Sequence, residues 1–325
     1  MLQLIRTALI GFGLAGEHLH APYLRGPDYE LTAVQSSRPD AVRANYPDVP
    51  VYGSLHDILS HHDIDLVVIA TPNAEHYPLA KQALEHGCHV LVEKPFTVTL
   101  EEAEHLSALA SSVDRLLTVY HNRRYVKDFH TLIKLKEAGE FGDIYTFEAH
   151  YDRYRPDVKE RWREQDVPGA GLLYDLGSHL IDQALTLYGE MPDRVFCDQT
   201  IQRTGGIVDD YTHLILAFGT RRAVLHIGSI VPSPGHSLVV HGTEASFFVD
   251  TVDTERETFE WALPEQPAIA RPFLASSFAD YYLDLARAIR GEAPLAVTTE
   301  ECVSVMNIIE CAQKSVKEGK WIRLE

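Results

Sequence analysis

Cysteine and long apolar runs are both scarce in this sequence, and each scarcity excludes a class of protein. The 325 residues include 4 cysteines, and none forms a C-x-x-C pair, so neither a disulfide framework nor a cysteine-based zinc site is indicated. No apolar run approaches the roughly 18 residues of a membrane span. The first residues lead directly into a predicted strand, with no room for a signal peptide. Buried free thiols in a reducing cytoplasm fit these features.

Positive charge is scarce as well. Lysine and arginine total 29 against 47 aspartates and glutamates, which gives a net charge of −18. Because such a surface repels phosphate backbones and anionic lipid, we expect neither nucleic acid nor a membrane as a partner. His18 with His20 and His61 with His62 lack the spacing of metal ligands on one helix face, so no metal site is predicted.

The first part of the chain, 1–121, alternates short apolar runs with helix-like segments. Runs with so little polar interruption suit strands buried on both faces of a parallel sheet. One intervening helix begins with a capping box at Thr99 and Glu102. The alternation predicts an α/β domain with a doubly wound parallel sheet. The predicted strands are Ile5–Ile10, Leu31–Gln35, Leu66–Ala70, Val90–Val92 and Leu116–Val119.

The second part, 122–325, has a different pattern. Its predicted strands are longer and follow one another closely, which indicates an α+β domain with a large open mixed or antiparallel sheet. A loop is expected over 251–275, and Thr298 with Glu301 offers a cap for the last helix. The predicted helices are Leu172–Tyr188, Phe278–Arg290 and Glu300–Lys317. The predicted strands are Arg194–Ile201, Tyr211–Phe218, Ala223–Ile230, Ser237–His241 and Ser246–Val249.

A glycine-rich turn, Gly11-Phe12-Gly13-Leu14-Ala15-Gly16, follows the first strand directly. In this pattern the first glycine permits a tight turn, the second lets the main chain approach a pyrophosphate, and the third allows helix and strand to pack closely. The phosphates then sit on free N–H groups at the helix start. The turn therefore predicts a dinucleotide site, with a purely structural turn as the alternative.

The end of the second strand bears on the choice of cofactor. NAD sites usually have an acidic residue there for the ribose 2′-hydroxyl, but this chain has Ser36, Ser37 and Arg38. Two hydroxyls and a guanidinium suit a 2′-phosphate, because arginine forms charge-assisted bonds with phosphate oxygens. We therefore expect NADP(H) in preference to NAD(H). Alternatively, Arg38 is only a solvated charge, or Asp40 takes the ribose role.

Two more segments follow predicted strands of the parallel sheet, at the edge where ligands gather in such folds. Thr71-Pro72-Asn73 with His76 offers hydrogen bonds to ribose or phosphate oxygens, although a histidine at a helix start is commonly a cap. Glu93-Lys94-Pro95 places an ammonium at a strand end, where it can stabilise a developing alkoxide or relay a proton. Glu93 can pair with Lys94 or hold the ribose, and Pro95 is a candidate for a cis peptide. A surface lysine is the alternative.

Asp175 and His179 stand one turn apart on a predicted helix. Histidine titrates near neutrality and suits general acid–base catalysis, while Asp175 can orient the ring or bind a second substrate hydroxyl. A surface pair is the alternative. Near the domain junction, Trp162 is a candidate wall for the nicotinamide or a sugar ring, and Arg163 a candidate phosphate ligand, with packing and salt bridges as the alternatives.

Taken in order, these motifs resemble those of the glucose–fructose oxidoreductase / inositol dehydrogenase family (Gfo/Idh/MocA), over essentially the whole chain. Further segments are similar to its NADP-dependent scyllo-inositol dehydrogenase branch. These segments are Tyr120-His-Asn-Arg-Arg124, Tyr154-Arg-Pro156, Arg161-Trp-Arg-Glu164 and Tyr174-Asp-Leu-Gly-Ser-His179-Leu-Ile-Asp-Gln183.

The resemblance implies a dinucleotide-binding Rossmann domain over 1–121. It implies a substrate-binding domain over 122–325, whose open sheet forms the interface of a homodimer or homotetramer. It also implies that Lys94, Asp175 and His179 are catalytic, with His179 as the acid–base group. Residues implied near the cofactor are Glu93, Asn122, Trp162, Arg163 and Tyr282.

The expected reaction is hydride transfer between NADP(H) and a secondary alcohol or ketone of a cyclitol or sugar. Two alternatives stay open: a glycosidase of the same family that uses NAD for transient oxidation, and a non-catalytic sensor that binds cofactor and a partner protein. The sensor has no need of Lys94, Asp175 and His179, so their joint presence argues against it.

Overall fold

A computed structural model describes residues 3–250 and 256–324, and the chain divides into two compact units. The first comprises Met1–Asn122 and Phe278–Val303, and the second comprises Arg123–Ser277 and Ser304–Glu325. A single division at 121/122 assigns 278–303 to the second domain, whereas the structure groups it with the first unit. The reason is that Tyr281 and Thr299 donate hydrogen bonds to carbonyls of the strand Leu117–Val119.

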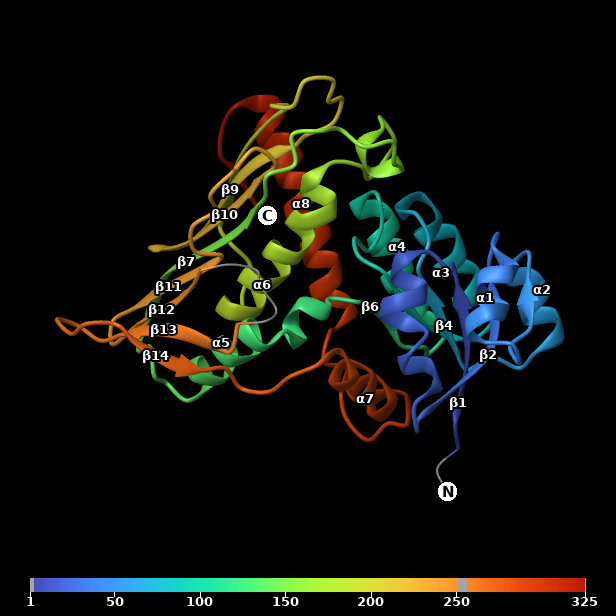
Figure 1. Ribbon diagram of the computed structural model, residues 1–325. Helices are drawn as coiled ribbons and strands as arrows, with labels where there is room; N and C mark the ends of the chain where they lie inside the picture. The colour runs from blue at the N-terminus through green and yellow to red at the C-terminus, as the bar shows by residue number, and fades with distance from the viewer. Residues whose placement is uncertain (1–2, 251–255, 325) are drawn as a thin grey trace. The chain divides into compact units, whose positions relative to one another are not determined.

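The first unit is built on a six-stranded sheet in the order β3-β2-β1-β4-β5-β6 (Figure 1). All its neighbouring strands are parallel, so the predicted doubly wound α/β fold is confirmed. The strand order runs outward in one direction from β1 to β3 and in the other direction from β4 to β6. Such folds bind ligands at the point between β1 and β4 where this order changes. The strands are β1 Ile5–Ile10, β2 Tyr29–Gln35, β3 Val51–Tyr52, β4 Leu66–Ile69, β5 His89–Val92 and β6 Leu117–Val119.

Helical segments join these strands in sequence. The predicted capping box is confirmed, because Thr99 Oγ1 accepts from the Glu102 N–H while the Glu102 carboxylate accepts from the Thr99 N–H. The helical segments up to β6 are η1 Gly16–His20, η2 Tyr23–Arg25, α1 Pro39–Asn45, α2 Leu55–His61, η3 Asn73–Glu75, α3 His76–Glu85 and α4 Leu100–Ser112. Next come η4 Asn122–Tyr125, α5 Lys127–Glu137, η5 Trp162–Glu164, η6 Leu173–Gly177, α6 Ser178–Tyr188, α7 Phe278–Ile289 and α8 Thr299–Glu318.

The second unit is built on a nine-stranded sheet in the order β14-β13-β12-β11-β7-β10-β9-β8-β15. Only β7 and β10 pair in parallel among these described strands, so the predicted mixed sheet is confirmed. Figure 1 shows α5 and α6 along one face of it. The strands are β7 Ile144–Asp152, β8 Arg194–Thr200, β9 Tyr211–Phe218, β10 Arg221–Gly228, β11 Leu238–Gly242, β12 Ser246–Val249, β13 Thr258–Ala262, β14 Ile269–Pro272 and β15 Ile322–Arg323.

The two faces of this sheet differ in burial. On β7, Phe147, Ala149 and Tyr151 are buried, while the alternating residues Glu148 to Asp152 are only half-buried. Because α6 packs on β7 and β10, the buried side chains mark the helix-covered face, and the alternating polar ones mark the opposite face, named here the open face.

The loop expected over 251–275 is wrong where two strands form, over Thr258–Ala262 and Ile269–Pro272. The segment forms the edge hairpin β13–β14, since Phe259 and Trp261 alternate with polar residues and are buried at 2% and 4% exposure. The remaining part of that expectation, 251–255, lies outside the described residues. Among the described residues, no helix combines the length and apolar character that crossing a bilayer requires.

Candidate active site

The glycine-rich turn joins β1 to η1 with one side packed and one side open. A Cβ on Gly16 would lie 2.1 Å from the Gly11 carbonyl oxygen, and one on Gly11, whose φ is +95°, would lie 2.5 Å from the Ala70 carbonyl oxygen. Both positions therefore require glycine for packing. A Cβ on Gly13 would meet nothing within 4 Å, so this glycine faces free space, as the approach of a pyrophosphate requires.

Buried polar atoms lie around the same edge of the sheet. Gln35 Oε1, Thr71 Oγ1 and Asn122 Oδ1 are buried, and each has no hydrogen-bond partner within the described part of the chain. These residues end or follow β2, β4 and β6. Since an unsatisfied buried polar atom costs about 1–3 kcal/mol, such a row fits a polar ligand lying across the strand ends. The residues present therefore fit a dinucleotide.

Arg38 contacts the glycine-rich turn from the end of the second strand. Its guanidinium donates a hydrogen bond to the Phe12 carbonyl, and its main-chain N–H donates to Ser36 Oγ over 2.9 Å. Asp40, the alternative ribose ligand, instead pairs with Arg43 over 3.1 Å on an exposed part of α1. The cation beside the turn is therefore Arg38.

Glu93 and Lys94 follow β5, with the Lys94–Pro95 peptide cis. The Glu93 carboxylate accepts from the Lys94 N–H at 3.0 Å and from His20 Nε2 at 3.1 Å. The other ring nitrogen, Nδ1, lies 2.5 Å from the Tyr282 hydroxyl. Burial alone would raise the pKa of Glu93, but the His20 hydrogen bond and the charges of His20 and Lys94 outweigh it and hold that pKa below its usual value.

His20 was not singled out as a site residue from the sequence. It lies four residues after Gly16 and is fully buried, and its partners Glu93 and Tyr282 are 73 and 262 residues away. The one local signal is a histidine one turn beyond the third glycine. Tyr282 lies behind this chain of hydrogen bonds, with its hydroxyl on His20, and it is 3% exposed.

His76 joins two of the predicted segments. Its Nδ1 lies 2.9 Å from the Pro95 carbonyl oxygen and its Nε2 lies 3.1 Å from the Thr71 carbonyl oxygen. The ring is fully buried, and burial lowers its pKa. Asn73 is also buried, at 4% exposure, and begins η3. The imidazole thus contacts main chain through both nitrogens and fixes the loops that carry Thr71 and Lys94.

Asp175 and His179 do not share one regular α-helix as predicted. Leu173–Gly177 forms a π-helical turn, and α6 begins at Ser178. Asp209 holds the start of this turn, since its carboxylate accepts from the Leu173 N–H at 2.9 Å. A Cβ on Gly171 would lie 1.8 Å from Asp209 Oδ1, so the carboxylate can approach only because a glycine is there. Such π turns are frequent at functional sites.

The side chains around Asp175 form a small recess. Arg163 Nε lies 3.2 Å from Asp175 Oδ1, and the Arg163 guanidinium lies 4.5 Å from the centroid of the Trp162 ring. His179 is 7% exposed, and its ring centroid lies 6.5 Å from that of Tyr151. Tyr151, Arg153, Arg163 and Asp175 are among the residues that line a recess of about 30 Å³. Asp175 thus lies beside Arg163, one of the predicted cofactor residues, while His179 lies near Tyr151.

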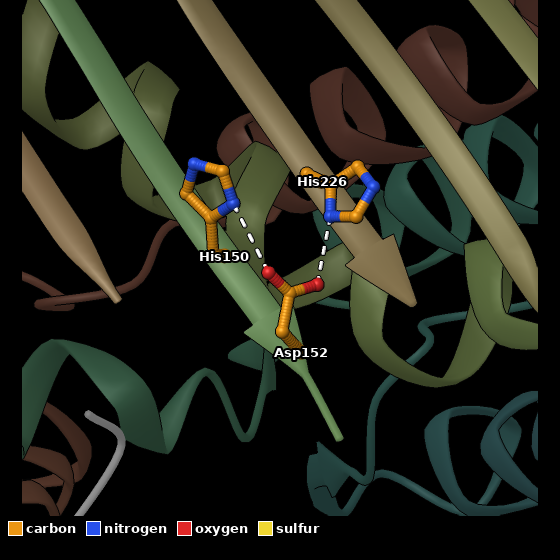
Figure 2. Close-up of side chains that lie close together, drawn as sticks. All are labelled: His150, Asp152 and His226. Atoms are coloured by element: carbon orange, nitrogen blue, oxygen red, sulfur yellow. Dashed lines mark hydrogen bonds and ion pairs between the residues drawn. The ribbon is translucent and has the colours of Figure 1, made fainter. Parts of the chain in front are cut away.

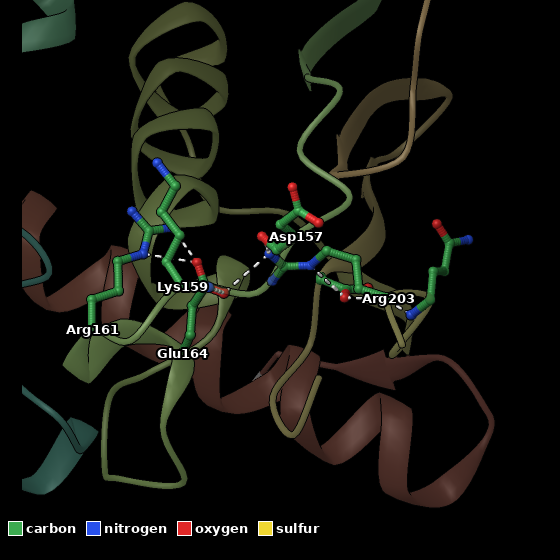
Figure 3. Close-up of polar contacts among 7 residues, drawn as sticks. Asp157, Lys159, Arg161, Glu164 and Arg203 are labelled. Carbon is green, nitrogen blue, oxygen red and sulfur yellow. Dashed lines mark hydrogen bonds and ion pairs between the residues drawn. The ribbon is translucent and has the colours of Figure 1, made fainter. Parts of the chain in front are cut away.

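An ionic network holds the segment that carries Trp162 and Arg163 (Figure 3). The Glu164 carboxylate accepts from the Lys159 N–H at 2.9 Å, from Arg161 Nε at 2.8 Å and from Arg203 Nη1 at 3.1 Å. Arg203 Nε also lies 2.8 Å from Asp210. The Arg203 side chain is 5% exposed and that of Asp210 is fully buried. Sequence reasoning missed Arg203 and its partner Asp210, because Arg203 lies 39 residues from Glu164 in the chain.

Each unit therefore brings together its own share of the predicted residues. The first gathers the glycine-rich turn, Arg38, Glu93 and Lys94 at the ends of parallel strands. The second places Arg163 and Asp175 at one recess, with Trp162 stacked on Arg163 and His179 near Tyr151, another residue of that recess. The expected convergence of Lys94 with Asp175 and His179 involves both units and stays a prediction.

Comparisons with known proteins cover both units. A family model described as an oxidoreductase family with an NAD-binding Rossmann fold, GFO_IDH_MocA, matches residues 5–121. The C-terminal alpha/beta domain of the same oxidoreductase family matches residues 133–324.

Individual relatives are similar over much of the chain. The scyllo-inositol 2-dehydrogenase (NADP(+)) IolW of Bacillus subtilis is 38% identical over 99% of this chain and 96% of its own length. D-glucoside 3-dehydrogenase of Escherichia coli is 32% identical over 57% of this chain and 54% of its own. Among solved structures, the oxidoreductase YvaA of Bacillus subtilis has a TM-score of 0.95 at 37% identity, covering 100% of this chain and 99% of that one.

Proposed function

We propose, from the premise that this chain belongs to the Gfo/Idh/MocA oxidoreductase family, that it is an NADP(H)-dependent dehydrogenase acting on a secondary alcohol of a cyclitol or sugar. The observation that carries the proposal is the strand edge of the first unit. There an open glycine-rich turn, unsatisfied buried polar atoms and the ammonium of Lys94 follow neighbouring parallel strands. A cofactor cradle and a fixed cation on one edge suit hydride transfer at a carbon that bears oxygen.

The preference for NADP(H) is proposed from Arg38. Its guanidinium lies at the Phe12 carbonyl within the glycine-rich turn, and its N–H holds Ser36 beside it. Two serines and a guanidinium suit the 2′-phosphate of NADP, whereas the acidic alternative Asp40 is engaged by Arg43. The NADP-dependent relative IolW supports the same preference.

We assign the remaining cofactor contacts by position. The turn from Gly11 to Gly16 would hold the pyrophosphate, and Thr71, Asn73 and Asn122 would offer polar atoms to ribose and amide. Trp162 and Arg163, stacked on each other, would contact the nicotinamide end. Pro72 and His76 shape the loop that bears Thr71, and Tyr282 acts through His20 on Glu93. His76 and Tyr282 are thus positioning residues.

The bound nicotinamide supplies or accepts the hydride. We propose that the ammonium of Lys94 stabilises the alkoxide that develops on the substrate, because a fixed charge in a dry site needs no reorganisation. His179 takes the hydroxyl proton on its imidazole during oxidation and returns it during reduction. Asp175, whose carboxylate is held by Arg163, orients the substrate through a second hydroxyl. Removal of water from a half-buried lysine strengthens each of these interactions.

The substrate class is proposed from the relatives and from the polar character of the recess. IolW is named for scyllo-inositol and another relative for a glucoside, and both substrates are rings that carry several hydroxyls. Asp175, Arg153 and Arg163 line the recess and offer the acceptors and donors such a ring needs. We also propose that the chain forms a homodimer or homotetramer through its nine-stranded sheet.

A substrate panel tests the proposal. The full chain is incubated with inositols and monosaccharides, each with NADP or NAD, and the absorbance of the reduced nicotinamide is followed. The proposal predicts steady growth of that absorbance with at least one polyol, and a higher kcat/KM for NADP. Release of sugar from glycosides with no net reduced cofactor would instead identify the glycosidase. Tight NADP binding without turnover of any polyol would identify the sensor.

A further inference from the structure

Three metal-ligating side chains meet on the open face of the nine-stranded sheet (Figure 2). His150 and Asp152 are two residues apart on β7 and so point to the same face. His226 on β10 is paired directly with His150 in the parallel register, and Gly228 is paired with Asp152. The register of two central strands thus brings the carboxylate between two imidazoles.

The ligand atoms of the three side chains are close enough to share one ion. His226 Nδ1 lies 2.7 Å from Asp152 Oδ1, and His150 Nδ1 lies 3.4 Å from Asp152 Oδ2. All three ligand atoms lie within 4.8 Å of one another. Among the histidine, cysteine and acidic side chains of residues 3–250 and 256–324, these three form the group whose ligand atoms are that close together. An ion bound at about 2.0–2.2 Å from each ligand requires only small side-chain rotations from this arrangement.

Gly228 leaves the space that the carboxylate occupies. A Cβ there would lie 3.2 Å from Asp152 Oδ1 and 3.3 Å from His226 Cε1, and 2.8 Å from a methyl of Val231. Any larger residue at this central strand position would therefore press on both the acid and the ring. β10 ends at this glycine, so the small residue serves both the turn toward Val231 and the side-chain cluster.

The cluster borders a hollow at the surface of the second unit. All three side chains are half-buried, and His150 and Asp152 line a hollow of about 240 Å³ that leaves room for water ligands. Arg123, Arg153 and Arg155 line the same hollow, and the guanidinium groups of Arg123 and Arg153 also lie at the Tyr151 ring. Glu148 Oε2 lies 3.8 Å from His150 Nε2, the kind of outer carboxylate that orients a metal-bound histidine.

We propose that His150, Asp152 and His226 bind one divalent transition-metal ion of the zinc class within a single chain. Two imidazoles and one carboxylate suit zinc, cobalt or nickel, whereas calcium and magnesium require oxygen ligands. The ion ties β7 to β10 and leaves positions for water. The sequence predicted no metal site, because His226 is 74 residues from Asp152 and only the strand register joins them. The proposed dehydrogenase chemistry does not need this ion.

Calorimetric titration tests the site. The full chain is stripped with EDTA and titrated with zinc chloride, and we expect one zinc ion per chain. His226→Ala and Asp152→Asn should each weaken zinc binding at least about tenfold, since even outer contacts of a metal have effects of that size. The matched control is His241→Ala, an exposed histidine on the open face that contacts Ser246. Zinc should also raise the Tm of the wild type and of His241→Ala, but not that of His226→Ala.

Three results would overturn the proposal. They are no zinc binding by the wild type, equal binding by the wild type and His226→Ala, or one zinc per two chains. If Asp152→Asn loses its native circular dichroism spectrum, His150→Ala replaces it as the second variant, with the same expected loss. Cobalt titration gives an independent readout, because the visible spectrum of bound Co²⁺ must be absent in His226→Ala and present in His241→Ala.

Discussion

In the first unit the glycine-rich turn and the ends of the parallel strands are placed chiefly by the main chain, whereas in the second unit the candidate site residues are placed by side chains distant in sequence. The glycine-rich turn is fixed by carbonyl groups that leave no room for a Cβ at Gly11 or Gly16. Lys94 and Thr71 follow strands of one parallel sheet. In the second unit, Asp209 holds the turn that bears Asp175, and the Glu164–Arg203 network holds the segment that bears Arg163.

This difference indicates how each region tolerates change. A site placed by main chain depends on a few glycines and on strand order, so most substitutions around it leave its geometry in place. A site placed by buried ion pairs depends on each partner, because removal of one leaves the other charged and buried. The second unit should therefore lose stability to single charge deletions, and the first unit chiefly to added methyl groups.

The largest expected effect is on the buried pair of the second unit. Arg124 Nη2 lies 2.6 Å from Asp182 on α6, with side chains 10% and 1% exposed. Arg124→Leu should lower the free energy of unfolding by about 3–5 kcal/mol, since it leaves a buried carboxylate without its cation. Denaturant unfolding measures the change, with Lys134→Leu as the control, whose exposed pair with Glu137 is worth about 0.5 kcal/mol. Equal effects of the two variants would contradict the claim that the second unit depends on its buried ion pairs.

Two alanine substitutions in the glycine-rich turn sharpen the comparison. Gly16→Ala places a methyl group 2.1 Å from a carbonyl oxygen and should cost about 1–3 kcal/mol of stability as well as cofactor binding. Gly13→Ala meets no protein atom within 4 Å, so it should weaken NADP binding while its Tm stays at the wild-type value. Thermal unfolding and fluorescence titration with NADP separate the outcomes. Normal NADP affinity in Gly13→Ala would mean that the pyrophosphate does not lie against Gly13.

Arg38 carries the proposed cofactor preference. Arg38→Ala should lower kcat/KM for NADP about 10- to 100-fold, the value of losing hydrogen bonds to a charged group, and leave kcat/KM for NAD nearly unchanged. Arg43→Ala, on the same α1 but paired with Asp40, is the matched control. Parallel losses with both cofactors in Arg38→Ala would show that this arginine does not read the 2′-phosphate.

The smallest expected effect concerns pH. The pKa of Glu93 is held below its usual value by His20 and Lys94, so its contribution to stability is present above pH about 4.3 and is lost as the pH falls through the lowered folded value. In His20→Ala the burial of Glu93 should raise its pKa above the unfolded value. The contribution of Glu93 to the free energy of unfolding should then fall, not rise, as the pH increases, by about 1.4 kcal/mol for each unit of difference between the two pKa values. Unfolding between pH 3 and 7, compared with the exposed His18→Ala, measures this. Identical slopes would mean that His20 does not set the charge of Glu93.

The sequence predicted the features that depend on residues close together in the chain. The parallel sheet, the glycine-rich turn, the two capping boxes and the position of Lys94 at a strand end all follow from local periodicity and spacing. Contacts between distant residues were missed, such as those of His20 with Glu93 and of Arg203 with Glu164, because their partners depend on the folded topology. The π turn before α6 also depends on such a contact, with Asp209.

A second kind of miss arose where two signals competed. Charged residues and prolines favoured a loop after Val249, but the alternation of Phe259 with Trp261 formed an edge hairpin. The metal-ligating cluster was missed because no local spacing relates His226 to Asp152.

The central claim is that Lys94 of the first unit and His179 of the second act on one substrate carbon. A double-mutant cycle in kcat/KM tests it, using the preferred polyol and NADP with Lys94→Ala, His179→Ala and the double variant. We predict that each single change costs about 2–4 kcal/mol of transition-state stabilisation, and that the double variant loses little more than the worse single, because residues acting as a unit are strongly non-additive. Near-normal kcat/KM in either single variant, or losses that multiply fully in the double variant, would contradict the claim.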